Sequence, residues 1–111
     1  MTDDKYLTLV TEYRKAVLKG NARQTERLHS ALMDYYHKKK RAGKLRDFLN
    51  FLNHNDTYVQ LWSATFLLTI EEEIAKSVLE DLSVNIPNDP QCPTGYASAI
   101  LDLWPKGKMN L

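Results

Sequence analysis

Apolar residues recur at helical spacing along almost the whole 111-residue chain, in short runs that end at glycine, proline or an Asn–Asp pair. The first run places Tyr6, Val10, Tyr13 and Val17 on one face of an α-helix. No segment keeps the strict alternation of a half-buried β-strand over a useful length. This pattern restricts the chain to an all-α fold of several short helices.

Six helical segments follow from the spacing, near residues 3–20, 21–43, 45–52, 56–70, 69–82 and 94–104 with their caps included. Five of them begin with a residue whose side chain can cap a helix N-terminus: Thr2, Asn21, Asp56, Thr69 and Thr94. Gln24 and Glu72 stand at capping-box spacing from two of these caps. Three prolines within residues 84–93 predict a loop there. Most links are short, so sequential helices should pack antiparallel.

The fourth segment is expected to be the most buried helix. Its inward positions are Val59, Trp62, Ser63, Phe66, Leu67 and Ile70, and the stripe is widened by Ala64 and Leu68. A helix that is apolar around most of its surface belongs in a protein core.

Composition favours a single globular domain over residues 1–111. The chain is 43% hydrophobic and 26% charged, and no apolar run approaches the ~20 residues that a membrane-spanning helix needs. The acidic start after Met1 lacks the basic and apolar segments of a signal peptide. Cys92 is the single cysteine, so no disulfide framework is expected. We therefore expect a cytoplasmic, all-helical domain that is monomeric when free.

Charge is distributed unevenly along the chain. Residues 1–55 hold twelve Lys or Arg and six Asp or Glu, a net charge of +6, whereas residues 56–111 hold three and eight, a net charge of −5. Such polarity suits electrostatic docking of a charged partner. Solvated helix faces that simply differ between the two halves would give the same totals.

The residue types that could serve catalysis are not arranged for it. The four glycines fall near helix ends, so none forms a phosphate-binding loop. His29 and His37 are eight residues apart on one helix, too far to share a metal ion, and His54 stands in a turn where a capping role fits. We expect no catalytic activity, no cofactor and no metal site.

Residues 45–82 have the order of a helical repeat. An apolar helix is followed by an Asn–Asp turn, a helix capped by Asp56, and a further apolar helix. We expect Val59 to pack on the first of these helices and Leu67 and Leu68 to face the next pair. This order resembles a HEAT-type repeat, which implies a short, HEAT/armadillo-like α-α superhelix of about three stacked helix pairs. An irregular helical bundle with the same caps is the alternative.

Further residues extend the resemblance along nearly the whole chain: Gly20-Asn21, Tyr35-Tyr36, Gly43 with Leu45, Asp56 with Val59, and Leu103-Trp104 with Gly107. Together they are similar to a family of short bacterial HEAT-like proteins, some of which resemble immunity proteins of contact-dependent growth inhibition systems. The resemblance implies a protein that binds the nuclease domain of a toxin and blocks its active site. It carries over no catalytic residue.

Acidic and aromatic side chains form the predicted partner-binding site, which consists of Tyr35, Tyr36, Tyr58, Glu71, Glu72, Glu73, Glu80 and Asp81. The three glutamates open a predicted helix, where they also complement the helix dipole, and the other two acids follow about two turns later. A basic toxin surface is expected to meet these acids. Two adjacent tyrosines cannot both face the core, and Tyr58 is expected to project outward as a contact residue.

A second hypothesis is a nucleic-acid-binding module. Six of the nine residues from 38 to 46 are basic: Lys38, Lys39, Lys40, Arg41, Lys44 and Arg46. They could contact phosphates without sequence preference. However, the C-terminal end of a helix favours cations in any case, and the acidic half would repel a duplex. A HEAT-like scaffold for another protein partner is a third possibility.

Overall fold

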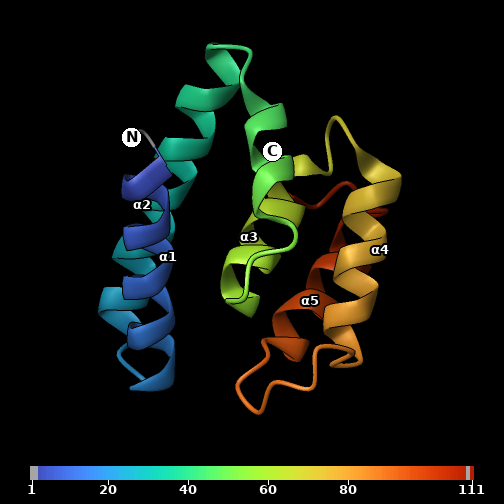
Figure 1. Ribbon diagram of the computed structural model, residues 1–111. Helices are drawn as coiled ribbons and strands as arrows, with labels where there is room; N and C mark the ends of the chain where they lie inside the picture. The colour runs from blue at the N-terminus through green and yellow to red at the C-terminus, as the bar shows by residue number, and fades with distance from the viewer. Residues whose placement is uncertain (1–2, 110) are drawn as a thin grey trace. The chain divides into compact units, whose positions relative to one another are not determined.

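The structure, a computed structural model, describes residues 3–109 and 111. Within them lie five α-helices, one 3-10 helix and no strand: α1 (Asp3–Leu18), α2 (Ala22–Arg41), η1 (Leu45–Phe51), α3 (Thr57–Leu67), α4 (Glu72–Ser83) and α5 (Thr94–Leu103) (Figure 1). The all-α prediction is confirmed. The chain divides into two compact units, unit 1 (Met1–Leu45) and unit 2 (Arg46–Leu111). A single domain and a stacked superhelix stay predictions.

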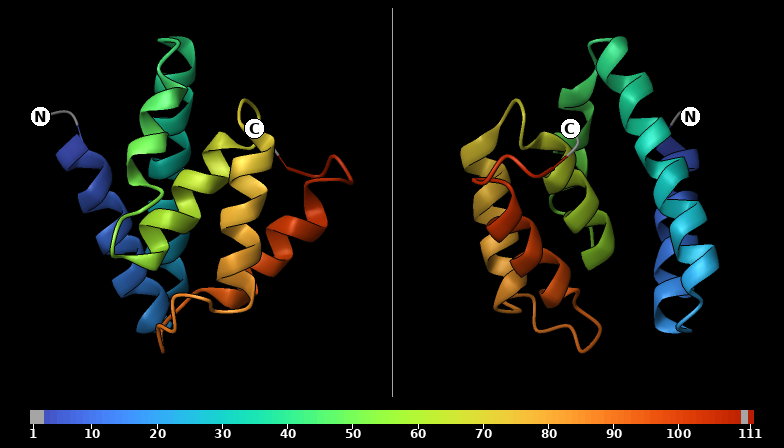
Figure 2. Two further views of the ribbon diagram at one scale, coloured as in Figure 1. Left: turned by 45° about the vertical axis from the view of Figure 1, so that its right-hand side comes forward. Right: turned by 180° about the vertical axis from the view of Figure 1, so that it is seen from behind.

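Unit 1 is a hairpin of the antiparallel helices α1 and α2, which pack against each other (Figure 2). The predicted inward face of α1 is confirmed at Tyr6, Val10 and Tyr13, which are all buried. The Tyr6 ring stacks on Tyr35 of α2, with the ring centroids 5.4 Å apart. Packing of this kind is what stabilises helices of such length in water. The predicted cap at Thr2 lies outside the described residues.

The second helix of unit 1 ends in a glycine turn, as the sequence predicts. Gly43 has a φ of +69°, a left-handed conformation that glycine adopts without strain. Its N–H donates to the Lys40 carbonyl oxygen at 3.1 Å, and the Lys44 N–H donates to the Lys39 carbonyl oxygen at 2.9 Å. These two bonds satisfy carbonyl groups that the end of the helix would leave open.

The predicted capping box at the start of α2 forms only in part. The Asn21 cap is confirmed, because its side-chain Oδ1 accepts from the Gln24 N–H at 3.1 Å. The return bond does not form, since the Asn21 N–H donates to the Ala16 carbonyl oxygen at 3.0 Å, in the turn that ends α1. The Gln24 side chain instead accepts from Arg27 at 2.7 Å.

The third predicted segment is a 3-10 helix, η1, with three residues per turn. Leu45, Phe48 and Phe51 are spaced by three and are at most 8% exposed, whereas Leu49 and Leu52 are half-buried. Residues spaced by three align on one face of a 3-10 helix and also share one side of an α-helix, so the sequence pattern alone does not separate the two. The predicted short helix is therefore present, in the 3-10 form.

α3 is the core of unit 2 and, as predicted, the most buried of the described helices. Ten of its eleven residues are buried, and Gln60 is the half-buried exception. Phe66 contacts two other rings, with centroids 5.1 Å from Phe48 of η1 and 5.4 Å from Trp62. α4 packs on α3 and α5 packs on α4, so unit 2 is built outward from this helix.

The N-cap predicted at Thr69 is wrong. α4 begins at Glu72 with Glu71 as its cap, and Thr69 is exposed in the preceding turn. The end of α3 shifts the start of α4, because the Ile70 and Glu71 N–H groups both donate to the Leu67 carbonyl oxygen, at 3.1 and 2.7 Å.

The loop predicted over residues 84–93 is confirmed as the link between α4 and α5. The cap of α5 is Pro93, and Thr94 is the first helical residue instead of the predicted cap. The difference arises because the Ala97 N–H closes the first turn on the Pro93 carbonyl oxygen, at 3.0 Å.

Replacement of Phe66 by alanine should destabilise the protein by about 3–5 kcal/mol, because it removes a fully buried ring from the contact with Phe48 and Trp62. Urea unfolding followed by far-ultraviolet circular dichroism measures the change. Val84→Ala is the control, since Val84 is 69% exposed and its truncation should change stability by less than about 0.5 kcal/mol. Equal effects of the two substitutions would contradict the assigned core.

Candidate functional site

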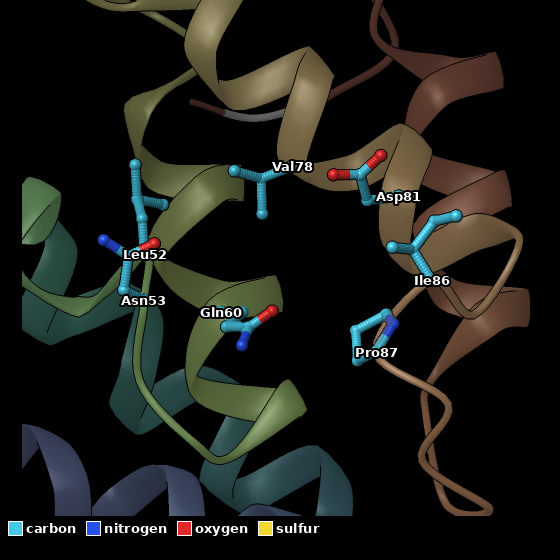
Figure 3. A pocket seen from close by; sticks show the side chains of 7 residues that line it. All are labelled: Leu52, Asn53, Gln60, Val78, Asp81, Ile86 and Pro87. Atoms are coloured by element: carbon cyan, nitrogen blue, oxygen red, sulfur yellow. The ribbon is translucent and has the colours of Figure 1, made fainter.

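A groove beside α4 combines apolar walls with polar groups in unit 2. Its volume is about 280 Å³, and we call it the α4 groove (Figure 3). It is lined by Leu52, Asn53, Gln60, Val78, Asp81, Ile86 and Pro87. These residues come from the turn after η1, from α3, from α4 and from the loop after α4.

The register of α4 places one wall of this groove. Ala75, Leu79 and Leu82 are buried against the rest of unit 2. Val78 and Asp81 each precede a buried leucine by one residue, so both lie along the same edge of the stripe and face the groove. Val78 is thus an apolar residue beside the buried stripe that lines the groove.

Gln60 forms the floor of the groove on the α3 side, and its orientation is fixed by a hydrogen bond. Its Nε2 donates to the His54 carbonyl oxygen at 2.6 Å. The amide nitrogen is thereby turned away, and the side-chain oxygen points toward Pro87 (Figure 3). The groove therefore receives a hydrogen-bond acceptor from the one α3 residue that is not fully buried.

The opposite wall is a loop held by its own hydrogen bonds. Asn85 ends α4 in the left-handed region, with a φ of 56°, and the Ile86 N–H donates to the Asp81 carbonyl oxygen at 2.9 Å. Asn85 and Asp89 then exchange two bonds: the Asp89 N–H donates to Asn85 Oδ1 at 2.9 Å, and Asn85 Nδ2 donates to the Asp89 carbonyl oxygen at 3.0 Å. The Thr57 hydroxyl of α3 donates to Asp89 Oδ2 at 2.9 Å. Ile86 and Pro87 thus stand on a fixed backbone.

The five predicted acids are not equivalent in the structure. The Glu71 carboxylate pairs with Arg46 at 3.2 Å, and the Glu72 carboxylate accepts from the Trp104 indole N–H at 2.9 Å. Both therefore serve contacts within unit 2. Glu73 and Glu80 are exposed on α4, and their carboxylates have no hydrogen bond or ion pair within the described residues. Asp81 alone of the five lines the α4 groove.

The predicted role of Tyr58 as an outward contact residue requires correction. Tyr58 is only 3% exposed, because α3 is buried on nearly every side and leaves no outward face at that position. Of the adjacent pair on α2, Tyr36 is fully buried and Tyr35 is half-buried. Tyr35 lies between the Tyr6 ring and the Lys39 ammonium, which is 5.7 Å from its ring centroid. Tyr35 is thus the one predicted aromatic residue with partly accessible surface.

The remaining residues of the α4 groove were not predicted. Leu52 falls at the end of a predicted helical segment, Pro87 is one of the three loop prolines, and Asn53, Gln60 and Ile86 belong to no motif. Ile86 is 65% exposed. The sequence signal for the groove was this single isoleucine among prolines and asparagines, because a loop that contacts only water gains no stability from a large apolar side chain.

The His54 turn has the capping role that the sequence predicts. Its Nδ1 accepts from the Asp56 N–H at 3.0 Å, and the Asp56 carboxylate in turn accepts from the Tyr58 N–H at 2.8 Å. This second bond confirms Asp56 as the N-cap of α3. Among the described residues, no three His, Cys, Asp or Glu side chains are placed to share a metal ion.

Cys92 is a half-buried thiol at the end of the loop. Its Sγ donates to the Leu82 carbonyl oxygen at 3.4 Å. Burial raises the pKa of the Cys92 thiol, and the negative charge of Asp89 raises it further. Both effects disfavour the thiolate, which is the nucleophilic form. The environment therefore makes Cys92 a structural residue of the loop.

None of the described helices combines the length and the apolar character that a membrane span requires. Comparison of the chain with protein-family models, with curated proteins and with solved structures gave no match.

Alkylation of Cys92 by iodoacetamide should show a pH midpoint above that of the same protein unfolded in urea, because folding raises the thiol pKa. Asp89→Asn should lower this midpoint, since it removes the negative charge that disfavours the thiolate. Asp102→Asn removes an exposed acid on α5 and serves as the control with an unchanged midpoint. A folded-state midpoint at or below the unfolded one would refute the assigned environment.

Proposed function

We propose that this protein is a protein-binding module that neutralises a toxin domain, and that unit 2 supplies the docking face. The observation that carries the proposal is the α4 groove, where apolar walls and a carboxylate occur together on the surface. Two further apolar side chains are exposed nearby in the sequence: Ile74 on α4 is 46% exposed, and Val84, directly after α4, is 69% exposed. Interfaces combine such anchors with a polar rim.

Charge supports a basic partner for this face. The boundary between the units separates the charges: unit 1 has eleven Lys or Arg and five Asp or Glu, a net of +6, and unit 2 has four and nine, a net of −5. Glu73 and Glu80 are exposed on α4, the helix that also carries the groove residue Asp81. A nuclease domain carries a basic surface where it holds nucleic acid, and negative charge on the inhibitor would speed its association.

The sequence resemblance to short HEAT-like immunity proteins supports the choice of a toxin as the partner. In this proposal η1 and α3 form a degenerate HEAT-like pair, α4 and α5 form the next, and the protein acts in the cytoplasm as a free monomer. The seven-residue 3-10 helix is shorter than the first helix of such a pair, so the repeat is irregular at this point.

The proposal predicts a complex with the C-terminal domain of a toxin encoded by the neighbouring open reading frame. Co-expression followed by affinity capture tests for it, and the absence of a complex at micromolar concentration would count against the proposal. The double substitution Glu73→Lys and Glu80→Lys should slow association by about tenfold, because it reverses charge on the docking face. Glu26→Lys reverses an exposed acid of α2 in unit 1 and should leave the rate within about twofold.

A second candidate function is nucleic-acid binding by unit 1. Five of the six predicted cations lie there, at the end of α2 and just after it, and two of them stand over tyrosine rings, Lys39 over Tyr35 and Lys40 at 6.0 Å from the Tyr36 centroid. The sixth cation, Arg46, pairs with Glu71 in unit 2. Phosphate contacts by the five cations of unit 1 would give a sequence-independent site.

This alternative predicts a steep dependence of affinity on salt. If about four phosphates are neutralised, log K should fall with log salt with a slope near −3 to −4 on single-stranded or duplex DNA. Fluorescence anisotropy with a labelled oligonucleotide measures the slope, and Lys38→Gln with Lys44→Gln should reduce it. A flat response, or no binding at low salt, would remove nucleic acid as a partner.

A further inference from the structure

We propose that the α4 groove is a receptor for one arginine side chain of the protein partner. This inference rests on the proposed function and names the contact at the centre of the docking face. It follows from the size of the groove, from the chemistry of its polar groups and from the shape of its walls.

The size of the groove suits a single side chain. Its volume of about 280 Å³ lies below the range of about 300–1,000 Å³ that small-molecule sites occupy. It opens between the turn after η1 and the loop after α4, both on the surface of unit 2, so a side chain on a partner surface can enter it (Figure 3).

The polar groups of the groove favour a cation. The Asp81 carboxylate has no hydrogen bond or ion pair within the described part of the chain, and one of its oxygens points across the groove toward Val78 (Figure 3). Gln60 offers its side-chain oxygen, because its nitrogen is held by the His54 carbonyl oxygen. Two acceptors with no competing cation at the groove attract a charged donor, and the net charge of −5 on unit 2 acts in the same direction.

The walls distinguish arginine from lysine. Leu52, Val78 and Ile86 provide apolar surface for the methylene stem, which both side chains can use. The head groups differ: a guanidinium is planar, weakly hydrated and presents five donors in a fork, whereas an ammonium is a compact and strongly hydrated point charge. The Asp81 carboxylate can accept two parallel N–H bonds from a guanidinium, a bidentate geometry that an ammonium does not offer.

The test uses N-acetyl-arginine amide as the probe and nuclear magnetic resonance of the whole protein as the readout. The Val78 methyl and Gln60 side-chain amide resonances should shift with a dissociation constant in about the millimolar range, as one side chain contributes only part of an interface. The isosteric but uncharged N-acetyl-citrulline amide should bind at least about fivefold more weakly, and N-acetyl-lysine amide should also bind more weakly.

Two variants that each remove one negative charge from unit 2 locate the charge. Asp81→Asn keeps the shape of the groove and should weaken arginine binding about fivefold, whereas Asp102→Asn removes an equal charge on α5, outside the groove, and should leave binding unchanged. Equal binding of arginine and citrulline, an Asp81→Asn protein that binds like the wild type, or no shift at these resonances overturns the inference. Lysine binding as tight as arginine binding overturns the choice of arginine.

The proposed function and this inference fail in different ways. A groove that binds the arginine probe, in a protein that captures no toxin domain, contradicts the toxin proposal and leaves the groove supported. A toxin complex whose dissociation constant is unchanged by Asp81→Asn supports the toxin proposal and overturns the role of the groove.

Discussion

Burial of α3 is the constraint on which the rest of unit 2 depends. Ten of its eleven residues are buried, and a helix that is apolar on all sides must be covered on all sides. Each large side chain that is fully buried contributes about 1.5–3 kcal/mol, so the ring contacts around Phe66 and the packing of α4 dominate the stability of the unit. The Thr65 hydroxyl is compatible with this burial, since it donates to the Leu61 carbonyl oxygen at 2.7 Å.

The same helix fixes the candidate site. Thr57, in its first turn, holds Asp89 of the loop, and Gln60, its one half-buried residue, sets the acceptor at the floor of the α4 groove. Because α4 turns its buried stripe toward α3, Val78 and Asp81 are left at the edge of that stripe. The α4 groove is thus a consequence of how the core of unit 2 is covered.

Helical periodicity predicted the fold class and the central helix, because a buried helix face repeats about every 3.6 residues, and the three prolines predicted the loop. Periodicity did not distinguish the 3-10 helix η1 from an α-helix, because residues spaced by three share a side of both. It also placed Tyr58 outside, because an apolar stripe does not show that α3 is covered on nearly every side. Of the site, only Asp81 could be predicted. The Gln60 side chain is oriented by the His54 carbonyl oxygen, and Ile86 is placed by a turn that its N–H closes on the Asp81 carbonyl oxygen; neither contact follows from helical periodicity.

Native-state hydrogen exchange of the free protein tests most directly whether α3 and its bonded loop hold the groove ready for a partner. The account predicts the slowest exchange in α3 and protection of at least about a hundredfold at the Ile86, Asp89 and Cys92 amides, whose N–H groups are all bonded within the unit. Exchange of these three amides at unfolded-chain rates, while α3 stays protected, would contradict it, because the loop wall would then form only after the partner has bound.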